Sequence, residues 1–363
     1  MDNLRILLIA MVIAHHAGQP YGRTGGAWPI ANPTRAALLG PFFTVNAAFG
    51  MGLFFLIAGY FVPASFDRKG ERRFLADRLI RLGVPLVFMS LVVFPVPAYL
   101  MEGHERPLVD FVAAYLRRPL VLHLWFVSYL IVLTVGYAVW RHLTDRWAWA
   151  RLRPGVPSHG AIVAYTIGLA VATFLVRVAF PVDRWVDVAP LLRVEPAHVP
   201  QYATFFVLGI LASRGDWLRR LPSRTSMPWF ALGLAASALC YATALLHVST
   251  RINIRVDNGG GMSLVAVVWS VLESVIAVGL SLGLLTLFRD YVNRQSALAQ
   301  QLAAAVFAVY LIHVAPVVGI QWLLAGAHMP PLAKFGLVTL TAVPLSFGLA
   351  AALRELPGVA RVV

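Results

Sequence analysis

Apolar runs of about 20 residues recur from one end of the chain to the other, and no other feature restricts the fold as strongly. A helix of this length is just long enough to cross the hydrocarbon core of a bilayer. Charged residues make up only 13% of the 363 residues, against about 25% in ordinary soluble domains, and the mean hydropathy is +0.75. We therefore predict one all-α integral-membrane domain over residues 1–363, a polytopic, multi-pass protein with about ten transmembrane helices. The predicted spans are 4–21, 41–63, 83–101, 121–140, 160–180, 201–213, 227–247, 263–288, 303–324 and 335–353.

The basic residues concentrate in alternate connections between these spans. Together, the connections 64–82, 141–159, 214–226 and 289–302 hold more Arg and Lys than the connections 22–40, 102–120, 181–200 and 248–262. Short cytoplasmic connections carry such an excess, so we expect both termini to face the cytoplasm and the protein to lie in the inner (plasma) membrane. The formal net charge of +14 comes from these connections, so no nucleic-acid partner is predicted. A single cysteine, Cys240, excludes an intrachain disulfide, and no oligomeric state is predicted.

Arg5 and His16 lie eleven residues apart in the first apolar run. Eleven helical steps end about 20° past three full turns, so the two side chains share one helix face, about 16 Å apart along the axis. His15 falls on a different face. Charged and titratable groups inside a membrane helix are costly and usually mark a functional site. The alternative is that Arg5 anchors the helix end at the headgroups while His16 bonds a neighbouring helix.

A second basic pair, Arg78 and Arg81, follows the second span and precedes Pro85. Residues three apart are neighbours on one helical face. Guanidinium groups offer bidentate donors, so adjacent arginines form a natural clamp for phosphates. The alternative is that these arginines only anchor the cytoplasmic end of a span.

Three more polar side chains interrupt apolar runs. Glu273 lies deep in the run 265–287, where its expected partner is an Arg or a His of another span. His123 precedes a probable interface tryptophan, and His313 lies three residues before Pro316, which can break a helix and free backbone carbonyls. These residues are second-tier candidates for lining a cavity, or they are packed residues that only join helices.

Signatures of soluble hydrolases, of phosphate-binding loops and of zinc proteases are missing from the sequence, and no metal site is predicted. The intramembrane inventory of Arg, His and one or two carboxylates suits general-base activation of a hydroxyl together with binding of an anionic donor.

Several of these segments resemble the acyltransferase 3 family of integral membrane acyltransferases, and within it the group around glucans biosynthesis protein C. The matching segments are Asp2-Asn-Leu-Arg5 with His15-His16, Gly52–Tyr60, Arg73–Arg81, His123–Phe126, Pro200–Tyr202 with Phe206–Ile210, and Tyr310–His313. They extend from the first predicted span to the ninth, so the resemblance covers nearly the whole chain.

The resemblance implies a membrane O-acyltransferase that moves an acyl group, commonly acetyl or succinyl, from acyl-CoA to a hydroxyl of a carbohydrate or glycan. It places the essential positions at Arg5, His16, Arg78 and Arg81. His16 would take the hydroxyl proton or act within an acyl relay, and Arg5 would hold the donor or tune His16. Arg78 and Arg81 would bind the phosphates of CoA. Ala58 stands where many relatives have Ser, so no chemistry is assigned to position 58.

A transporter or flippase of a glycan or of an acyl-linked metabolite is the alternative function. Intramembrane Arg, His and Glu side chains also form translocation paths. No inverted repeat is visible in the sequence, which favours the enzyme, and a purely structural membrane subunit is a weaker third alternative.

Overall fold

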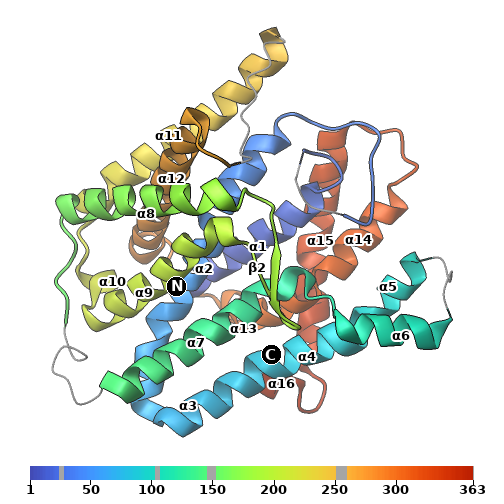
Figure 1. Ribbon diagram of the computed structural model, residues 1–363, viewed down its shortest axis with the longest axis horizontal. Helices are drawn as coiled ribbons and strands as arrows, with labels where there is room; N and C mark the ends of the chain where they lie inside the picture. The colour runs from blue at the N-terminus through green and yellow to red at the C-terminus, as the bar shows by residue number, and fades with distance from the viewer. Residues whose placement is uncertain (24–27, 103–106, 145–152, 251–259, 363) are drawn as a thin grey trace.

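The computed structural model describes residues 1–23, 28–102, 107–144, 153–250 and 260–362. These residues form a bundle of α-helices with one small hairpin beside α7 and α9 (Figure 1). The α-helices are α1 (Asp2–Gly18), α2 (Leu39–Lys69), α3 (Glu71–Arg78), α4 (Val84–Phe88), α5 (Pro95–Met101), α6 (Leu108–Arg117), α7 (Trp125–Thr144), α8 (His159–Ala179), α9 (Val199–Arg214), α10 (Trp217–Arg220), α11 (Ser223–Thr250), α12 (Leu264–Asp290), α13 (Ala297–Ile312), α14 (Val314–Leu323), α15 (Pro331–Arg354) and α16 (Val359–Val362). The hairpin pairs β1 (Val186–Ala189) with β2 (Leu192–Val194) in antiparallel register, Val186 opposite Val194.

The predicted all-α, polytopic membrane architecture is confirmed. In the described ranges, seven helical stretches are long and apolar enough to cross a membrane, or eight if the bent pair α13–α14 forms one span. Helices α1 and α9 cover two further predicted spans but have only 17 and 16 residues. The orientation of the termini stays a prediction. Parts of the connections on which it depends, residues 103–106, 145–152 and 251–259, lie outside the described residues.

The segment 67–81, which we expected to be a connection with Arg78 and Arg81 on one helical face, is largely helical and runs directly into the third predicted span. From Glu71 the chain runs through α3, a π-helical turn (Leu79–Gly83), α4, a second π-helical turn (Met89–Val93) and α5. A proline follows each π-helical turn within two residues: Pro85 follows the first and Pro95 follows the second. A proline clashes with the carbonyl four residues earlier in an ordinary α-helix, and a wider turn relieves that clash. Arg78 and Arg81 therefore belong to the same continuous helical stretch as the third predicted span.

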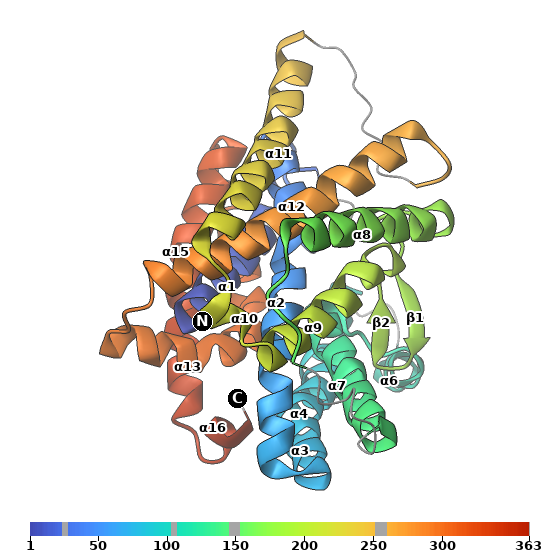
Figure 2. The same cartoon turned by 90° about the vertical axis from the view of Figure 1, so that its left-hand side faces the viewer.

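Two groups of helices meet around α1 and α2. Helix α1 packs against α2, α13, α14 and α15, while α12 packs against α2, α8 and α11. Figures 1 and 2 both show α8, α11 and α12 together on one side of the bundle. Helices α2 and α9 cross closely at Gly59 and Gly209, where an added Cβ would collide with the backbone of the other helix at Phe206 and Leu56. Small residues permit this approach between membrane helices.

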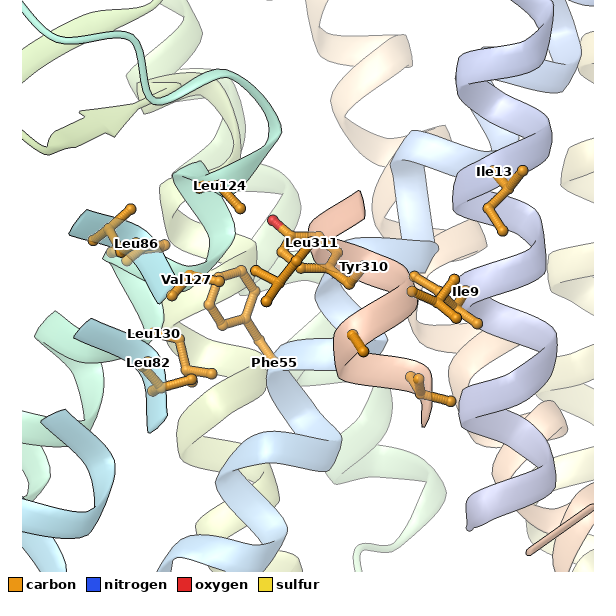
Figure 3. Close-up of a cluster of buried hydrophobic side chains, with 14 of the residues drawn as sticks. Ile9, Ile13, Phe55, Leu82, Leu86, Leu124, Val127, Leu130, Tyr310 and Leu311 are labelled. Carbon is orange, nitrogen blue, oxygen red and sulfur yellow. The ribbon is translucent and has the colours of Figure 1, made fainter. Parts of the chain in front are cut away.

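An apolar layer fills the space between α1, α2, α7 and α13. Ile9 and Ile13 of α1 and Phe55 of α2 are completely buried, and they belong to one cluster with Tyr310 and Leu311 of α13. Figure 3 shows Tyr310 and Leu311 between Ile9 on one side and Phe55 on the other. This layer separates the two ends of α1, and each end borders a cavity that contains some charged or polar side chains.

Candidate active site

The break between α13 and α14 brings a histidine into the interior. The two helices meet at His313 with a bend of 64°. Pro316 follows three residues later and has no backbone N–H for the carbonyl of Ile312. Carbonyls in the last turn of a helix need other donors. Here the Tyr310 carbonyl accepts a hydrogen bond from His313 Nδ1 at 2.7 Å, and the Leu311 carbonyl accepts one from His123 Nε2 at 3.1 Å. The predicted helix break is confirmed, and carbonyls beside it hold two histidine rings.

Three histidines from separate elements form a cluster at this break: His16 near the end of α1, His123 in the 3-10 turn (Leu122–Leu124) before α7, and His313. The ring centroid of His313 lies 4.9 Å from that of His16 and 5.0 Å from that of His123. His16 Nδ1 lies 3.0 Å from His313 Nε2 and 3.1 Å from the carbonyl oxygen of Val12. The histidine cluster therefore connects two neighbouring helices by a direct ring-to-ring hydrogen bond.

The hydrogen bonds of this cluster determine which nitrogens carry protons. A carbonyl oxygen can only accept, so His313 Nδ1 carries a proton and, in the neutral ring, His313 Nε2 is an acceptor. His16 Nδ1 then donates to His313 Nε2 and to the Val12 carbonyl, which leaves the lone pair on His16 Nε2. No group in the described ranges hydrogen-bonds that nitrogen. The geometry leaves His16 Nε2 available to take a proton from a bound molecule.

Trp28 covers the histidine cluster from the connection between α1 and α2. Its ring stacks on that of His16, with centroids 5.4 Å apart and planes at 22°. Its indole N–H donates to Gln321 Oε1 at 2.7 Å, and Gln321 Nε2 donates to the carbonyls of His16 and Ala17, both at 3.1 Å. Gln321 is fully buried. These contacts fix the position of the His16 ring and keep one of its faces away from solvent.

A cavity of about 320 Å³ opens on the other side of His16. We call it the histidine cavity. Its lining includes His15, His16, Met51, His123, Trp125, Arg177, Asp183, Trp185, Glu195, His198, Tyr202, Trp269, Glu273 and Tyr310. Among the described residues, no group of three His, Cys, Asp or Glu side chains is arranged to hold a metal ion. The cavity thus combines aromatic walls, a histidine base and ionisable side chains from several elements.

Four ionisable side chains, each at most 14% exposed, form another part of the lining of the histidine cavity. Glu273 Oε2 lies 2.5 Å from Arg177 Nη2, and Glu273 Oε1 lies 2.9 Å from His198 Nε2. The second nitrogen of that imidazole, Nδ1, lies 2.8 Å from Glu195 Oε2. Both ring nitrogens face carboxylates, so both must donate and His198 is an imidazolium. We call this set the charge cluster, and its two positive and two negative groups balance.

Two carboxylates that line this cavity, Glu195 and Asp183, have pKa values shifted in opposite directions. Burial raises the pKa of Glu195, but the adjacent His198 and the backbone N–H of Asp183 lower it further, so its pKa lies below the ordinary value. Burial, together with the neighbouring Glu195 carboxylate, raises the pKa of Asp183 above its ordinary value. Glu195 therefore stays ionised, whereas Asp183 takes up a proton more readily than an exposed aspartate.

A second cavity of about 340 Å³ borders the other end of α1. We call it the arginine cavity, because Arg5, Arg78 and Arg81 line it together with residues of α2, α7 and α13. Arg5 lies 3.5 Å from the Asp2 carboxylate, whereas no carboxylate in the described ranges pairs with Arg78 or Arg81. Met51 and Tyr310 line both cavities, so the two sites share part of their lining.

The predicted site residues thus divide between two cavities. Arg5 and His16 lie on one helix, as predicted, but Arg5 lines the arginine cavity and His16 lines the histidine cavity. His123 and Glu273 line the histidine cavity, while His313 lies behind His16. The prediction that Glu273 pairs with an Arg or a His of another span is confirmed by Arg177 of α8, and His198 is a second partner. His15 packs on Phe43 at 5.0 Å and lines the histidine cavity too, so a difference of about 100° around the helix does not remove it from the site.

Three side chains of the site were not predicted from the sequence: Trp28, Glu195 and Gln321. Trp28 and Glu195 lie in connections that read as ordinary turns, and Gln321 lies in an apolar run. A buried amide in such a run is itself a signal, because it needs hydrogen-bond partners from other segments. Glu195, three residues before His198, is a second signal, since this spacing allows a carboxylate–imidazole contact within one turn.

The chain is similar to known proteins over most of its length. The family described as an acyltransferase domain matches residues 1–351. Glucans biosynthesis protein C of Salmonella agona (strain SL483), of Salmonella paratyphi A (strain ATCC 9150 / SARB42) and of Salmonella paratyphi B (strain ATCC BAA-1250 / SPB7) are each 26% identical to the chain over 323 residues, covering 86% of this chain and 80% of the relative. No solved structure matches significantly. Since the match extends over nearly the whole chain, the protein belongs to the acyltransferase 3 family and is a membrane acyltransferase that transfers groups other than aminoacyl groups.

Proposed function

We propose that this protein is an inner-membrane O-acyltransferase that transfers an acyl group, such as acetyl or succinyl, from acyl-CoA to a hydroxyl of a carbohydrate or glycan. The main observation behind the proposal is a pair of cavities whose linings share Met51 and Tyr310. One cavity offers three guanidinium groups for an anionic donor, and the other offers a histidine base and aromatic walls for a neutral, hydroxyl-rich acceptor.

The arginine cavity suits the CoA end of the donor. Arg5, Arg78 and Arg81 come from two helices, and Arg78 and Arg81 have no carboxylate partner in the described ranges, so their donors are available to phosphates. From Arg5 to His16 the axis of α1 covers about 16 Å. A long, flexible thioester arm can follow this helix past Met51 and Tyr310 and present its carbonyl to the histidine cavity.

The reaction then needs one base. A hydroxyl of the acceptor approaches His16 Nε2 and gives up its proton as its oxygen attacks the thioester carbonyl. The new C–O ester bond forms, the C–S bond breaks, and the CoA thiolate takes the proton back from the imidazolium. During attack, the proton on His16 Nδ1 remains shared between His313 Nε2 and the Val12 carbonyl, which stabilises the developing positive charge.

The carbohydrate acceptor is supported by the names of the relatives, which are glucan biosynthesis proteins, and by the aromatic lining of the histidine cavity. The predicted topology supports a donor that enters from the cytoplasm, since the excess of basic residues lies on the side of Arg78 and Arg81.

The decisive experiment uses purified protein in liposomes with labelled acyl-CoA donors and a gluco-oligosaccharide, with mass spectrometry of the sugar. Wild-type protein should form an acylated sugar. His16→Ala should form none while retaining expression, folding and acyl-CoA binding, and His15→Ala should retain part of the activity because His15 makes no hydrogen bond within the histidine cluster. Full activity of His16→Ala would contradict the general-base role. Movement of sugar across the membrane without any acylated product would favour a transporter.

A further inference from the structure

We propose that one part of the histidine cavity is a subsite for a sugar ring. The ring would be contacted there by the Asp183 carboxylate and by the indole rings of Trp185 and Trp269. This inference rests on the proposed function, because it concerns the carbohydrate acceptor. The proposed subsite gives a role to three side chains that take no part in the proposed acyl transfer. The three residues come from the connection between α8 and α9 and from α12, and all line the histidine cavity.

The charge cluster supports the walls of this subsite but does not itself bind the sugar. Arg177, His198 and Glu195 are 3%, 6% and 8% exposed, and both oxygens of Glu273 are occupied by the two basic groups. A balanced, buried set of this kind has little left to offer a ligand, and breaking it would be costly. The polar group that remains available at this end of the cavity is Asp183.

Asp183 is held in place by its backbone. Its N–H donates to Glu195 Oε1 at 2.7 Å, and its φ of 66° lies in the left-handed region, which non-glycine residues rarely adopt. Such a conformation persists only where surrounding contacts hold it, and it is common at ligand sites. Asp183 keeps an exposed surface at the cavity although its carboxylate is partly desolvated, and no described residue donates a hydrogen bond to that carboxylate. The fold thus presents a fixed, unpaired carboxylate to the cavity.

Several aromatic rings line the same cavity as this carboxylate. Trp185 lies two residues further along, with its ring centroid 5.6 Å from that of Trp125, and Trp125 in turn stacks on Tyr202 at 5.3 Å and 25°. Tyr202 stacks on the charged ring of His198 at 5.7 Å and 21°. The charge cluster therefore supports a row of rings, stacked from His198 to Trp125 and ending with an edge-on contact between Trp125 and Trp185. Trp269 adds a ring from α12.

This combination fits a pyranose better than other small molecules. The C–H face of a sugar ring is apolar and packs flat on an indole, while the hydroxyls at its rim donate to a carboxylate that has two accepting oxygens. Mostly aromatic walls with a few placed polar groups are typical of specific small-molecule sites. The subsite lies in the same cavity as His16, so a ring bound there can place a hydroxyl of the same or of a neighbouring sugar unit at the base.

Saturation-transfer NMR of glucotetraose, titrated onto the protein in nanodiscs, tests the subsite without requiring turnover. Wild type should show a saturable signal from the ring C–H groups. Asp183→Asn, Trp185→Ala and Trp269→Ala should each raise the Kd by about 10-fold or more, because each removes a principal contact. Trp185→Phe, which keeps a ring, should retain most of the affinity. The matched controls Asp110→Asn on α6 and Trp322→Ala on α14 alter exposed residues outside this cavity and should bind like wild type.

The outcomes separate this inference from the proposed function. The subsite is overturned if wild type gives no saturable signal, or if all three variants bind like wild type and acylate the sugar with an unchanged KM. If wild type binds glucotetraose through these residues but forms no acylated product with any donor, the subsite stands and the acyltransfer to carbohydrate fails.

Discussion

Replacing Glu273 with Leu should destabilise the protein far more than an average substitution does. Glu273 is the shared partner of Arg177, at 2.5 Å, and of His198, at 2.9 Å. Without it the charge cluster carries two positive groups and only the Glu195 carboxylate. Arg177 is 3% exposed and loses its counter-charge altogether. Removing one partner of a buried ion pair costs about 3–5 kcal/mol, so we expect a loss of about that size for Glu273→Leu.

The double variant Arg177→Met/Glu273→Leu should recover most of this loss. It removes one charge of each sign and leaves His198 paired with Glu195, so the cluster is neutral again. Replacing a complete buried pair by apolar side chains is often close to neutral. We therefore expect the double variant to lie within about 2 kcal/mol of wild type, so that the two single losses together exceed the loss of the double variant by more than about 1 kcal/mol.

Equilibrium unfolding in mixed micelles of a mild detergent and dodecyl sulfate, followed by circular dichroism, measures these four free energies of unfolding. The exposed pair Arg193 and Asp187, at 3.5 Å, provides a matched cycle, in which the coupling energy should stay below about 1 kcal/mol. If the losses of Arg177→Met and Glu273→Leu simply add in the double variant, the two side chains are not coupled by charge and the reasoning fails.

The catalytic site and the topology give further predictions. His313→Ala should lower kcat about 10- to 100-fold with little change in the KM for acyl-CoA, because one hydrogen bond to a charging imidazole is worth about 1.5–3 kcal/mol; steady-state kinetics showing an unchanged kcat would contradict this. Changing both Arg78 and Arg81 to Lys should weaken acyl-CoA binding, and changing both to Ala should weaken it more, about 10-fold or beyond, because the bidentate donors are lost; equal donor affinity in equilibrium binding would reassign the pair to anchoring. Arg72→Cys in a Cys240→Ser background should be protected from an impermeant maleimide in intact cells, and labelling from outside would reverse the predicted orientation.

The sequence allowed a good prediction of the parts of this structure that depend on local spacing. The common helix of Arg5 and His16, the apolar spans and the break near Pro316 all follow from helical geometry and from residue chemistry within a few turns. The partner class of Glu273 was also predictable, since an intramembrane carboxylate needs a basic group.

Other features depend on which distant segments meet, and spacing does not encode that. The bond between His16 and His313 joins residues 297 positions apart, and the bond between Trp28 and Gln321 joins residues 293 positions apart. Arg78 and Arg81 were assigned to a connection because the run 71–82 is rich in charge, while the π-helical turn before Pro85 continues the helix through it. The division into two cavities follows from the position of Tyr310, whose neighbours come from α1, α2 and α7.

The carbonyls beside the helix break have a consequence for how the site tolerates change. In many hydrolases a carboxylate orients the histidine, and that orientation is lost when the carboxylate is protonated or mutated. Here the backbone oxygens of Tyr310, Leu311 and Val12 hold the three rings. A peptide oxygen neither titrates nor disappears when a side chain is exchanged. The orientation of the three rings is therefore set by chain geometry, and it should survive changes in the surrounding side chains, provided that the bend itself is kept.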